Sequence, residues 1–202
     1  MAVKDHSLDP VIVASARKEF LEHGYQKASL HKIAQDAGIT TGALYTRYRN
    51  KDALFRSLVE PVLQEMALKA VPIRTLYEEV RKSPGTAAFL NAIHQEEKIY
   101  LDLLFDHYED CILFFCKSSG SSLEKEIQQM MDAKSAETIS FFRSIARQDL
   151  DYDGLRLIMS QQFYYYRQIL QQGFGREKAM SCMKTVELFL EAGWETLLGH
   201  IL

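Results

Sequence analysis

Apolar residues recur along most of this chain at the three- and four-residue spacing of amphipathic helices. The spacing is clear between Leu30 and Ala37, because Ile33 and Ala34 complete one apolar face with them. Ser29 stands just before this face, where a side-chain oxygen can accept a hydrogen bond from a free amide of the first helical turn. The pattern therefore predicts a helix that begins near Leu30.

A tight turn and a second short helix are predicted to follow. Gly38 comes after the last apolar position, where a helix end favours a residue that tolerates positive φ, and Thr40 supplies the next capping oxygen. Leu44 and Tyr48 are four residues apart and would hold the second helix on the core. This arrangement is the outline of a helix-turn-helix, whose second helix reads the major groove of DNA.

The outward face of the second helix carries small, hydroxyl-bearing and basic residues. Small residues let a helix backbone approach base edges, and hydroxyl and guanidinium groups suit phosphates and guanine edges. Asn50 can cap a following helix that opens at Lys51, whose ammonium group and first-turn amides would both meet a phosphate oxygen. The outward residues of the second helix and its end are Thr41, Gly42, Ala43, Tyr45, Thr46, Arg47 and Arg49.

The segment from Gly24 to Phe55 reads GYQKASLHKIAQDAGITTGALYTRYRNKDALF and resembles the N-terminal signature of the TetR family of bacterial one-component transcription regulators. That signature consists of a G-[FY] pair, an I-A-x-x-A-G-[VI]-[ST]-x-G-x-[LI]-Y run and N-K-[ED]-x-L. The resemblance is free of gaps and covers roughly residues 9 to 58. The rest of the chain is similar to the family only in length and helical character.

The resemblance implies roles for individual residues. Ser29 and Lys32 would touch backbone phosphates, and Tyr45 and Lys51 would clamp further phosphates. The residues implied to enter the major groove are Thr40, Thr41, Gly42 and Ala43. Many family members carry an aromatic residue and then a histidine where this chain has Thr46 and Arg47. A DNA contact from Arg47, like one from Arg49, therefore rests on its charge alone.

The whole chain is predicted to be all-α. It has four prolines and ten glycines, and it shows neither repeats nor alternating strand patterns. Asp9 would cap a first helix that ends at Gly24 and completes a three-helix head. A fourth helix would run from Lys51 to about Lys69, with a kink before Pro61. Further helices are expected near residues 84–106, 108–117, 122–148, 152–173 and 175–200.

Two domains follow from this order of helices. Residues 1–56 would form a helix-turn-helix DNA-binding domain, and residues 57–202 a helical-bundle domain for ligand binding and dimerisation. Residues 1–56 carry nine Lys or Arg against six acids, a net charge of +3, whereas residues 57–202 have a net charge of −6. A basic head on an acidic body fits local contact with nucleic acid.

The last two predicted helices carry more apolar surface than one monomer core can cover. The aromatic residues Phe163 to Tyr166 point around the whole circumference of their helix, and the final helix has a broad apolar band. We expect a four-helix interface between two copies of the chain, as the family resemblance also implies. The alternative is a well-buried helix pair within a monomer. The candidate interface residues are Phe163, Tyr164, Tyr165, Phe189, Leu190, Trp194 and Leu197.

The family resemblance also implies a small-molecule effector bound inside the helical body. Aromatic and pliable apolar side chains on the expected helices would suit such a pocket, although for each one taken alone an ordinary core position is the favoured interpretation. The candidate pocket residues are Phe89, His94, Glu97, Tyr100, Phe114, Met130, Phe141 and Tyr166.

Glu97 interrupts an apolar helical stripe with a carboxylate, and His94 lies beside it. A buried carboxylate is costly unless it is paired. Glu97 would therefore serve a cationic or hydrogen-bonding ligand or have an internal partner, or it would reach solvent if its helix tilts.

Neither metal nor catalytic chemistry is expected. His107, Cys111 and Cys116 share part of a helix face, but no fourth ligand has suitable spacing for a zinc site. The chain has no Gly-rich phosphate loop, no G-x-S-x-G and no H-E-x-x-H motif. We therefore expect neither an enzyme nor a cofactor.

A cytoplasmic location is expected. The start MAVKDHSLDP lacks the apolar region of a signal peptide, and no segment approaches the roughly 20 apolar residues of a membrane-spanning helix. The three cysteines are odd in number and lie in apolar helical surroundings, which suits a reducing compartment.

The sequence thus predicts a dimeric regulator of transcription, most often a repressor in the resembling family. It would bind a palindromic DNA operator and be released by a small molecule in its body, without contact to a membrane. The alternative is a helical protein that binds a small molecule or metal and whose head makes protein contacts.

Overall fold

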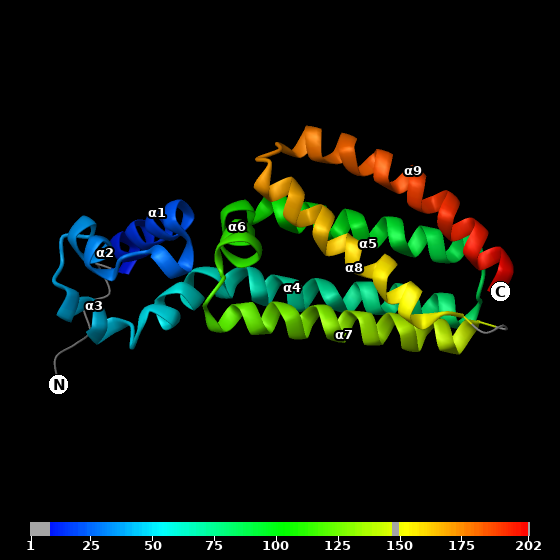
Figure 1. Ribbon diagram of the computed structural model, residues 1–202, viewed down its shortest axis with the longest axis horizontal. Coiled ribbons are helices and arrows are strands. Elements are labelled where there is room, and N and C mark those ends of the chain that lie inside the picture. Colours follow the sequence, from blue (N-terminus) through cyan, green and yellow to red (C-terminus); the bar gives the residue numbers. More distant parts are fainter. Residues whose placement is uncertain (1–8, 147–149, 202) are drawn as a thin grey trace. The chain divides into compact units, whose positions relative to one another are not determined.

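The computed structural model describes residues 9–146 and 150–201, and within these ranges all regular secondary structure is helical (Figure 1). The expected all-α class is confirmed. The helices are α1 (Asp9–Lys27), α2 (Leu30–Asp36), α3 (Thr41–Arg47), α4 (Lys51–Lys82), α5 (Thr86–Asp106), α6 (Tyr108–Lys117), α7 (Ser122–Ile145), α8 (Tyr152–Gln171) and α9 (Arg176–Ile201).

The chain forms two compact units, whose limits fall within α4 and α7 and after the first residue of α6. The first unit contains the residues up to Leu63 together with Glu109–Ile127, and the second contains Gln64–Tyr108 together with the residues from Gln128 onward. Helices α4 and α7 therefore each contribute to both units. The domain boundary after residue 56 stays a prediction from the sequence.

The core of the first unit is built around aromatic rings from α1 and α4. Phe20 and Phe55 are fully buried, and their ring centroids lie 4.8 Å apart in an edge-on arrangement. The Tyr25 ring lies 5.2 Å from that of Phe55. Ile33 of α2 and Leu44 of α3 are buried as well, as their spacing in the sequence predicts. The ring contacts join α1 to α4, and α2 contacts both α1 and α3.

One expected helix end is confirmed by the structure and one is corrected. The range Asp9–Lys27 of α1 contains a kink at Gly24, the expected end of the first helix, where the backbone leaves the helical region with φ 70° and ψ 169°. Glycine tolerates this conformation because it has no Cβ atom. Helix α4 does not end near Lys69 but runs through Pro61 and Pro72 to Lys82.

The extension of α4 has a physical reason in packing. Proline removes a backbone donor and disfavours the helix interior, so Pro72 argues locally against continuation. Ile73 and Val80 are nevertheless buried, and Tyr77 packs against the Phe141 ring at 5.3 Å between centroids. Burial of these side chains offsets the local preference. The expected end of the 122–148 helix lies outside the described residues, since α7 is described to Ile145.

The second unit has an aromatic core. Phe89 of α5 contacts Phe142 of α7 and Trp194 of α9, with both centroid separations at 5.3 Å. The rings of Phe142 and Trp194 are stacked at 5.7 Å. Leu155 of α8 is buried in the same cluster. Four helices therefore meet around one set of rings.

None of the helices in the described ranges combines the length and apolar character needed to cross a membrane.

Candidate functional site

Helix α2 has well-defined ends. The Ser29 hydroxyl oxygen accepts a hydrogen bond from the Lys32 amide at 3.3 Å, which confirms the predicted N-cap. At the other end Gly38 has φ 68°, its amide donates to the Gln35 carbonyl at 3.1 Å, and the Ile39 amide donates to the Ala34 carbonyl at 3.0 Å. This pair of bonds is a Schellman motif, which satisfies helix carbonyls that otherwise lack partners.

Helix α3 begins directly after this turn. The Thr40 hydroxyl accepts from the Ala43 amide at 3.1 Å, so the second predicted N-cap is confirmed. Leu44 is buried and fixes the helix to the core, whereas the Tyr45 side chain on the neighbouring position is 51% exposed. The Thr46 hydroxyl donates to the Gly42 carbonyl at 3.0 Å. Together, α2 and α3 form the expected helix-turn-helix.

Gly42 is exposed at the N-terminal end of α3. A Cβ atom added there would meet only the Thr40 hydroxyl oxygen, at an ordinary contact distance of 3.8 Å. Gly42 has no positive φ, so neither backbone conformation nor packing requires glycine. A residue without a side chain at this exposed position leaves the helix backbone open to close approach from outside.

The basic residues at the end of α3 differ in their surroundings. The Arg47 guanidinium lies 3.1 Å from the Asp9 carboxylate, and its side chain is 15% exposed. Arg49 is exposed. The structure thus brings Arg47 into an ion pair with α1 and leaves Arg49 accessible on the surface.

Lys51 opens α4 in a defined position. The Asn50 side-chain oxygen accepts from the Ala53 amide at 2.7 Å, which confirms the predicted cap of α4. The Lys51 ammonium donates to the Gln26 carbonyl at 3.1 Å and lies 5.0 Å from the centroid of the Tyr25 ring. Partial burial lowers the pKa of Lys51, and the nearby Glu19 carboxylate opposes this shift.

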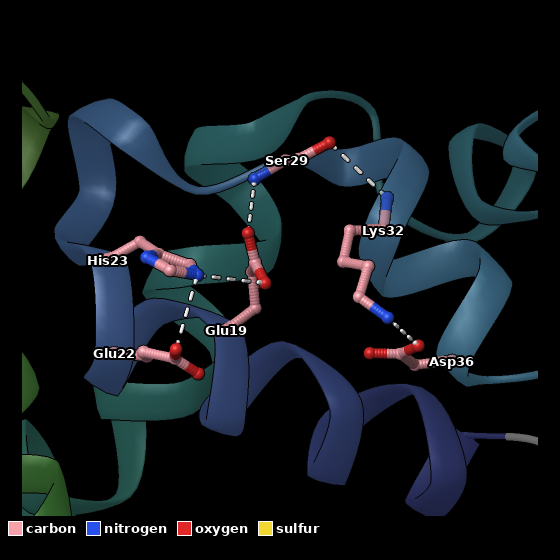
Figure 2. Close-up of polar contacts among 6 residues, drawn as sticks. All are labelled: Glu19, Glu22, His23, Ser29, Lys32 and Asp36. Atoms are coloured by element: carbon pink, nitrogen blue, oxygen red, sulfur yellow. Dashed lines mark hydrogen bonds and ion pairs between the residues drawn. The ribbon is translucent and has the colours of Figure 1, made fainter.

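Glu19 of α1 connects the helices beneath this surface, and sequence reasoning missed it. Its carboxylate is buried, at 7% exposure, and accepts a hydrogen bond from the Ser29 amide at 2.8 Å (Figure 2). Its other oxygen lies 3.8 Å from Nε2 of His23. Ile12, Ala16 and Phe20 are buried on the same face of α1, so a carboxylate within this apolar face was the available signal.

Lys32 lies on the outer surface of α2, where its ammonium group pairs with the Asp36 carboxylate (Figure 2). The hydrogen bond to Asp36 raises the pKa of Lys32. The ammonium group therefore stays charged at neutral pH.

Comparison with known families concerns the residues of this surface. Residues 12–58 match the family described as bacterial regulatory proteins, tetR family. This segment, which is less than half of the chain, is similar to that family. The match covers the helix-turn-helix and its capping residues, which are the elements that the sequence signature predicts.

Curated relatives are similar to part of this chain. The HTH-type transcriptional repressor Rv1474c of Mycobacterium tuberculosis is 39% identical over 59 residues, which are 29% of this chain and 32% of that protein. The probable acrEF/envCD operon repressor of Escherichia coli is 37% identical over 57 residues, 27% of this chain and 26% of that protein. The chain thus matches about a third or less of the length of these relatives.

Solved structures share the fold over nearly the entire length. A TetR-like transcriptional regulator from Rhodococcus sp. RHA1 is 15% identical with a TM-score of 0.62, over 95% of this chain and 100% of that chain. The fatty acid degradation regulator FadR from Bacillus halodurans is 18% identical with a TM-score of 0.58, over 92% and 98% of the two chains. At these identities the comparison establishes the fold alone.

The second unit contains a cavity of about 500 Å³. Three of the candidate pocket residues, Phe89, Tyr100 and Phe141, line it. His94 lines a different groove, which is formed by residues of α5 and α9. Met130 is half-buried on α7 and lines neither. Phe114 is buried within the first unit, so the structure does not bring it to this cavity.

Glu97 is 3% exposed, so it does not reach solvent. Its carboxyl group shares a hydrogen bond with the Glu187 carboxyl, and burial together with this neighbour raises the pKa of Glu97 to about 8. A hydrogen bond between two carboxyl groups requires a proton on one of them. Within the described chain, Glu97 Oε2 and the Tyr166 hydroxyl are buried without a hydrogen-bond partner. Both residues lie in the interior of the second unit, outside the lining of the cavity.

The candidate interface residues of α8 and α9 fall into separate groups. Phe189 is 78% exposed, and Tyr164 is exposed as well. Phe163, Tyr165 and Leu190 are half-buried. Trp194, in contrast, lies in the aromatic core of its own chain, and Leu197 packs against that core. These two residues stabilise the protomer itself.

The described residues contain no group of three His, Cys, Asp or Glu side chains that could hold a metal ion. Cys111 is buried, and burial raises the pKa of its thiol to about 12. The thiol is therefore protonated at neutral pH.

Proposed function

We propose that the chain is a ligand-responsive DNA-binding transcription regulator. It would act as a homodimeric repressor in the cytoplasm, bind a palindromic operator, and be released by a small molecule bound in its second unit. The observation that carries this proposal is the exposed face of α3, where Gly42 and Tyr45 face outward from a helix that Leu44 fixes to the core, with Arg49 exposed just after the helix. A rigid helix with small residues at its exposed N-terminal end fits the major groove.

The proposed DNA contacts divide into two kinds. Contacts to base edges would come from Thr41, Gly42 and Ala43, because these positions lie at the start of α3. Contacts to phosphates would come from Ser29, Lys32, Tyr45, Arg49 and Lys51, and Thr40 would enter the major groove with the start of α3. Arg47 would contribute less than Arg49, since it pairs with Asp9 inside the head.

Two features support a dimer that responds to a ligand. Exposed apolar side chains on α8 and α9, such as Tyr164 and Phe189, offer a surface that a second copy would cover. Helix α4 carries both Lys51 and cavity-lining residues such as Arg81, so one helix connects the proposed DNA contact with the proposed effector site. A coupling of about 1 to 3 kcal/mol would change operator affinity about 5- to 150-fold.

The test is a fluorescence-anisotropy titration with the DNA upstream of the chain's own coding sequence, at two salt concentrations. Binding should fall with added salt, and Lys51→Ala should reduce the slope of log K against log salt by about 0.9, because one phosphate contact is lost. The control Lys178→Ala changes an exposed lysine of α9 and should leave the slope unchanged. Indifference of the wild-type chain to all DNA would favour the alternative, a helical ligand- or metal-binding protein whose head contacts other proteins.

A further inference from the structure

The cavity of the second unit is lined by residues of four helices and has an aromatic floor. Phe89 and Phe141 are buried at the floor, with Tyr77 and Tyr100 beside them. The volume of about 500 Å³ lies within the range of small-molecule sites in proteins, which are mostly apolar with a few polar groups that orient the ligand. The chemistry of the ligand therefore depends on the charged groups that reach this cavity.

Cations of the chain itself already occupy aromatic faces in the cavity. The Arg81 guanidinium lies 5.6 Å from the centroid of the Phe141 ring, and the Lys134 ammonium lies 5.4 Å from that of Tyr77. Attraction between a cation and a ring is the usual way in which an aromatic site holds a positively charged ligand. A third cation placed here would meet Arg81 and Lys134 and be repelled by both.

The guanidinium groups at the rim are available for an anion. In the described parts of the chain, neither Arg74 nor Arg81 has a carboxylate within ion-pair distance. Both line the cavity from α4, and both are exposed at its rim. Guanidinium groups form paired hydrogen bonds with carboxylates and phosphates, and such bonds are stronger than neutral ones.

The acidic groups around the cavity do not cancel its preference for an anionic ligand. Glu96 is buried and already accepts hydrogen bonds from the Tyr77 hydroxyl and from Lys134, so its charge is compensated. Glu78 and Glu137 are exposed at the rim, as Arg74 and Arg81 are, so solvent screens both signs alike, and the lining carries three cations against these two carboxylates. The Lys134 ammonium can still donate to a ligand, because it has three hydrogens and lines the cavity.

We propose that this cavity binds an amphipathic anion, with an apolar body against Phe89, Tyr100 and Phe141 and a carboxylate or phosphate head held by Arg74 and Arg81. The proposal rests on the proposed function in that it assigns the chemical class of the effector. It concerns binding to the cavity, however, and is measured without DNA.

The experiment uses the full chain and three probes with the same alkyl body: decanoate, decanol and decylamine, each below its micelle concentration. Isothermal titration calorimetry should show that decanoate binds at least about tenfold more tightly than decanol, since a charged hydrogen bond is lost with the head group. Decylamine should bind more weakly than decanol. Decyl phosphate distinguishes the two anionic heads, and binding of either anion supports the proposal.

Matched variants locate the binding site. Arg81→Met keeps an unbranched side chain but removes the charge, and it should weaken decanoate binding about tenfold or more while decanol binding stays nearly constant. Arg74→Met should act in the same direction. Arg167→Met, at an exposed arginine of α8 outside the cavity lining, should leave all three affinities unchanged.

Three results would overturn the proposal. The first is that decylamine or decanol binds as tightly as the anions. The second is that neither anion binds at millimolar concentration. The third is that Arg81→Met and Arg167→Met lose equal amounts of affinity for decanoate. The proposed function fails separately, if the wild-type chain does not bind DNA. Release of DNA by decanoate would join the two proposals.

Discussion

Glu19 shows how a single buried carboxylate organises the helix-turn-helix. It lies within the apolar face of α1 and accepts the hydrogen bond of the Ser29 amide, which is the residue that caps α2. The same carboxylate acts electrostatically on Lys32 and Lys51. One side chain thus connects the start of α2 with two of the proposed phosphate contacts.

Replacement of Glu19 should affect both stability and DNA binding. Glu19→Leu leaves the Ser29 amide without its acceptor and should lower the free energy of unfolding by about 1 to 3 kcal/mol. Glu19→Gln keeps an acceptor oxygen and should lose less. Urea unfolding and operator titrations of both variants give the measurement, with Glu22→Gln, at an exposed neighbour, as the control. Equal losses of unfolding free energy in Glu19→Leu and Glu19→Gln would show that the hydrogen bond from the Ser29 amide does not contribute to stability.

The carboxyl of Glu97 gives the second unit a distinctive pH dependence. In the unfolded chain it titrates near 4.5, whereas its pKa in the folded protein is about 8. Between these values the folded protein holds more protons than the unfolded chain, so its free energy of unfolding falls as pH rises from about 5 to about 8. The Glu97 contribution is complete below pH 4.5 and is lost as pH passes 8.

Glu97→Gln should therefore flatten the dependence of stability on pH. One proton difference corresponds to a slope of about 1.4 kcal/mol per pH unit, and the variant should lose up to that much slope between pH 5 and 8. Urea unfolding at several pH values and a fixed protein concentration measures it. Glu195→Gln, at an exposed residue of α9, should keep the wild-type slope. Identical slopes in wild type and Glu97→Gln would refute the shared proton.

At the scale of elements, helix caps were predictable because capping is local. Ser29, Thr40 and Asn50 each accept from an amide three residues further along the chain, and the residue types alone indicate this. The end of α4 was not predictable in the same way. Pro72 argues locally for termination, and only contacts with α5 and α7 make the continuation to Lys82 favourable.

The candidate site residues also separate into those whose placement local sequence decides and those whose placement depends on tertiary contacts. Residues of α2 and α3 face outward as predicted, because a short amphipathic helix has one inner face. Trp194 was assigned to a dimer interface from a helix with a broad apolar band, and such a band does not distinguish the core of one chain from a contact between two. The role of Glu19 depends on the approach of α1 to Ser29, which sequence spacing does not encode.

Gly42 of α3 provides a test in which stability and function should move in opposite directions. Gly42→Ala has room for its methyl group and should raise the free energy of unfolding by up to about 1 kcal/mol, because alanine favours helix. The same methyl group should weaken operator binding if α3 enters the major groove. Thermal unfolding and anisotropy titrations on one preparation compare the two effects. Unchanged DNA affinity would place Gly42 outside the interface.

At the scale of the whole molecule, the main prediction is that two copies of the chain assemble into a dimer. Phe189→Glu changes a side chain that is 78% exposed in the protomer, so the fold should persist. A charge on a surface covered by a second copy should instead shift the protein from dimer to monomer in multi-angle light scattering. A wild-type monomer at micromolar concentration would contradict the dimer directly.

Trp194→Ala serves as the contrasting variant. Trp194 lies in the core with Phe89 and Phe142, so its removal should lower the free energy of unfolding by about 3 to 5 kcal/mol. The loss should appear in unfolding curves of the protomer as well as of the dimer. Dissociation without destabilisation would place Trp194 at the interface after all.

The two prolines of α4 give this helix a preferred direction of bending. Pro61 and Pro72 are eleven residues apart, which is close to three helical turns, so both lie on the same side of α4. Each removes one amide donor, and the carbonyls of Ser57 and Leu68, four residues earlier, lose that partner. Helix α4 should therefore bend in the same direction at both of these weakened turns. The helix that carries Lys51 and Arg81 should be compliant in one plane and stiff in the other.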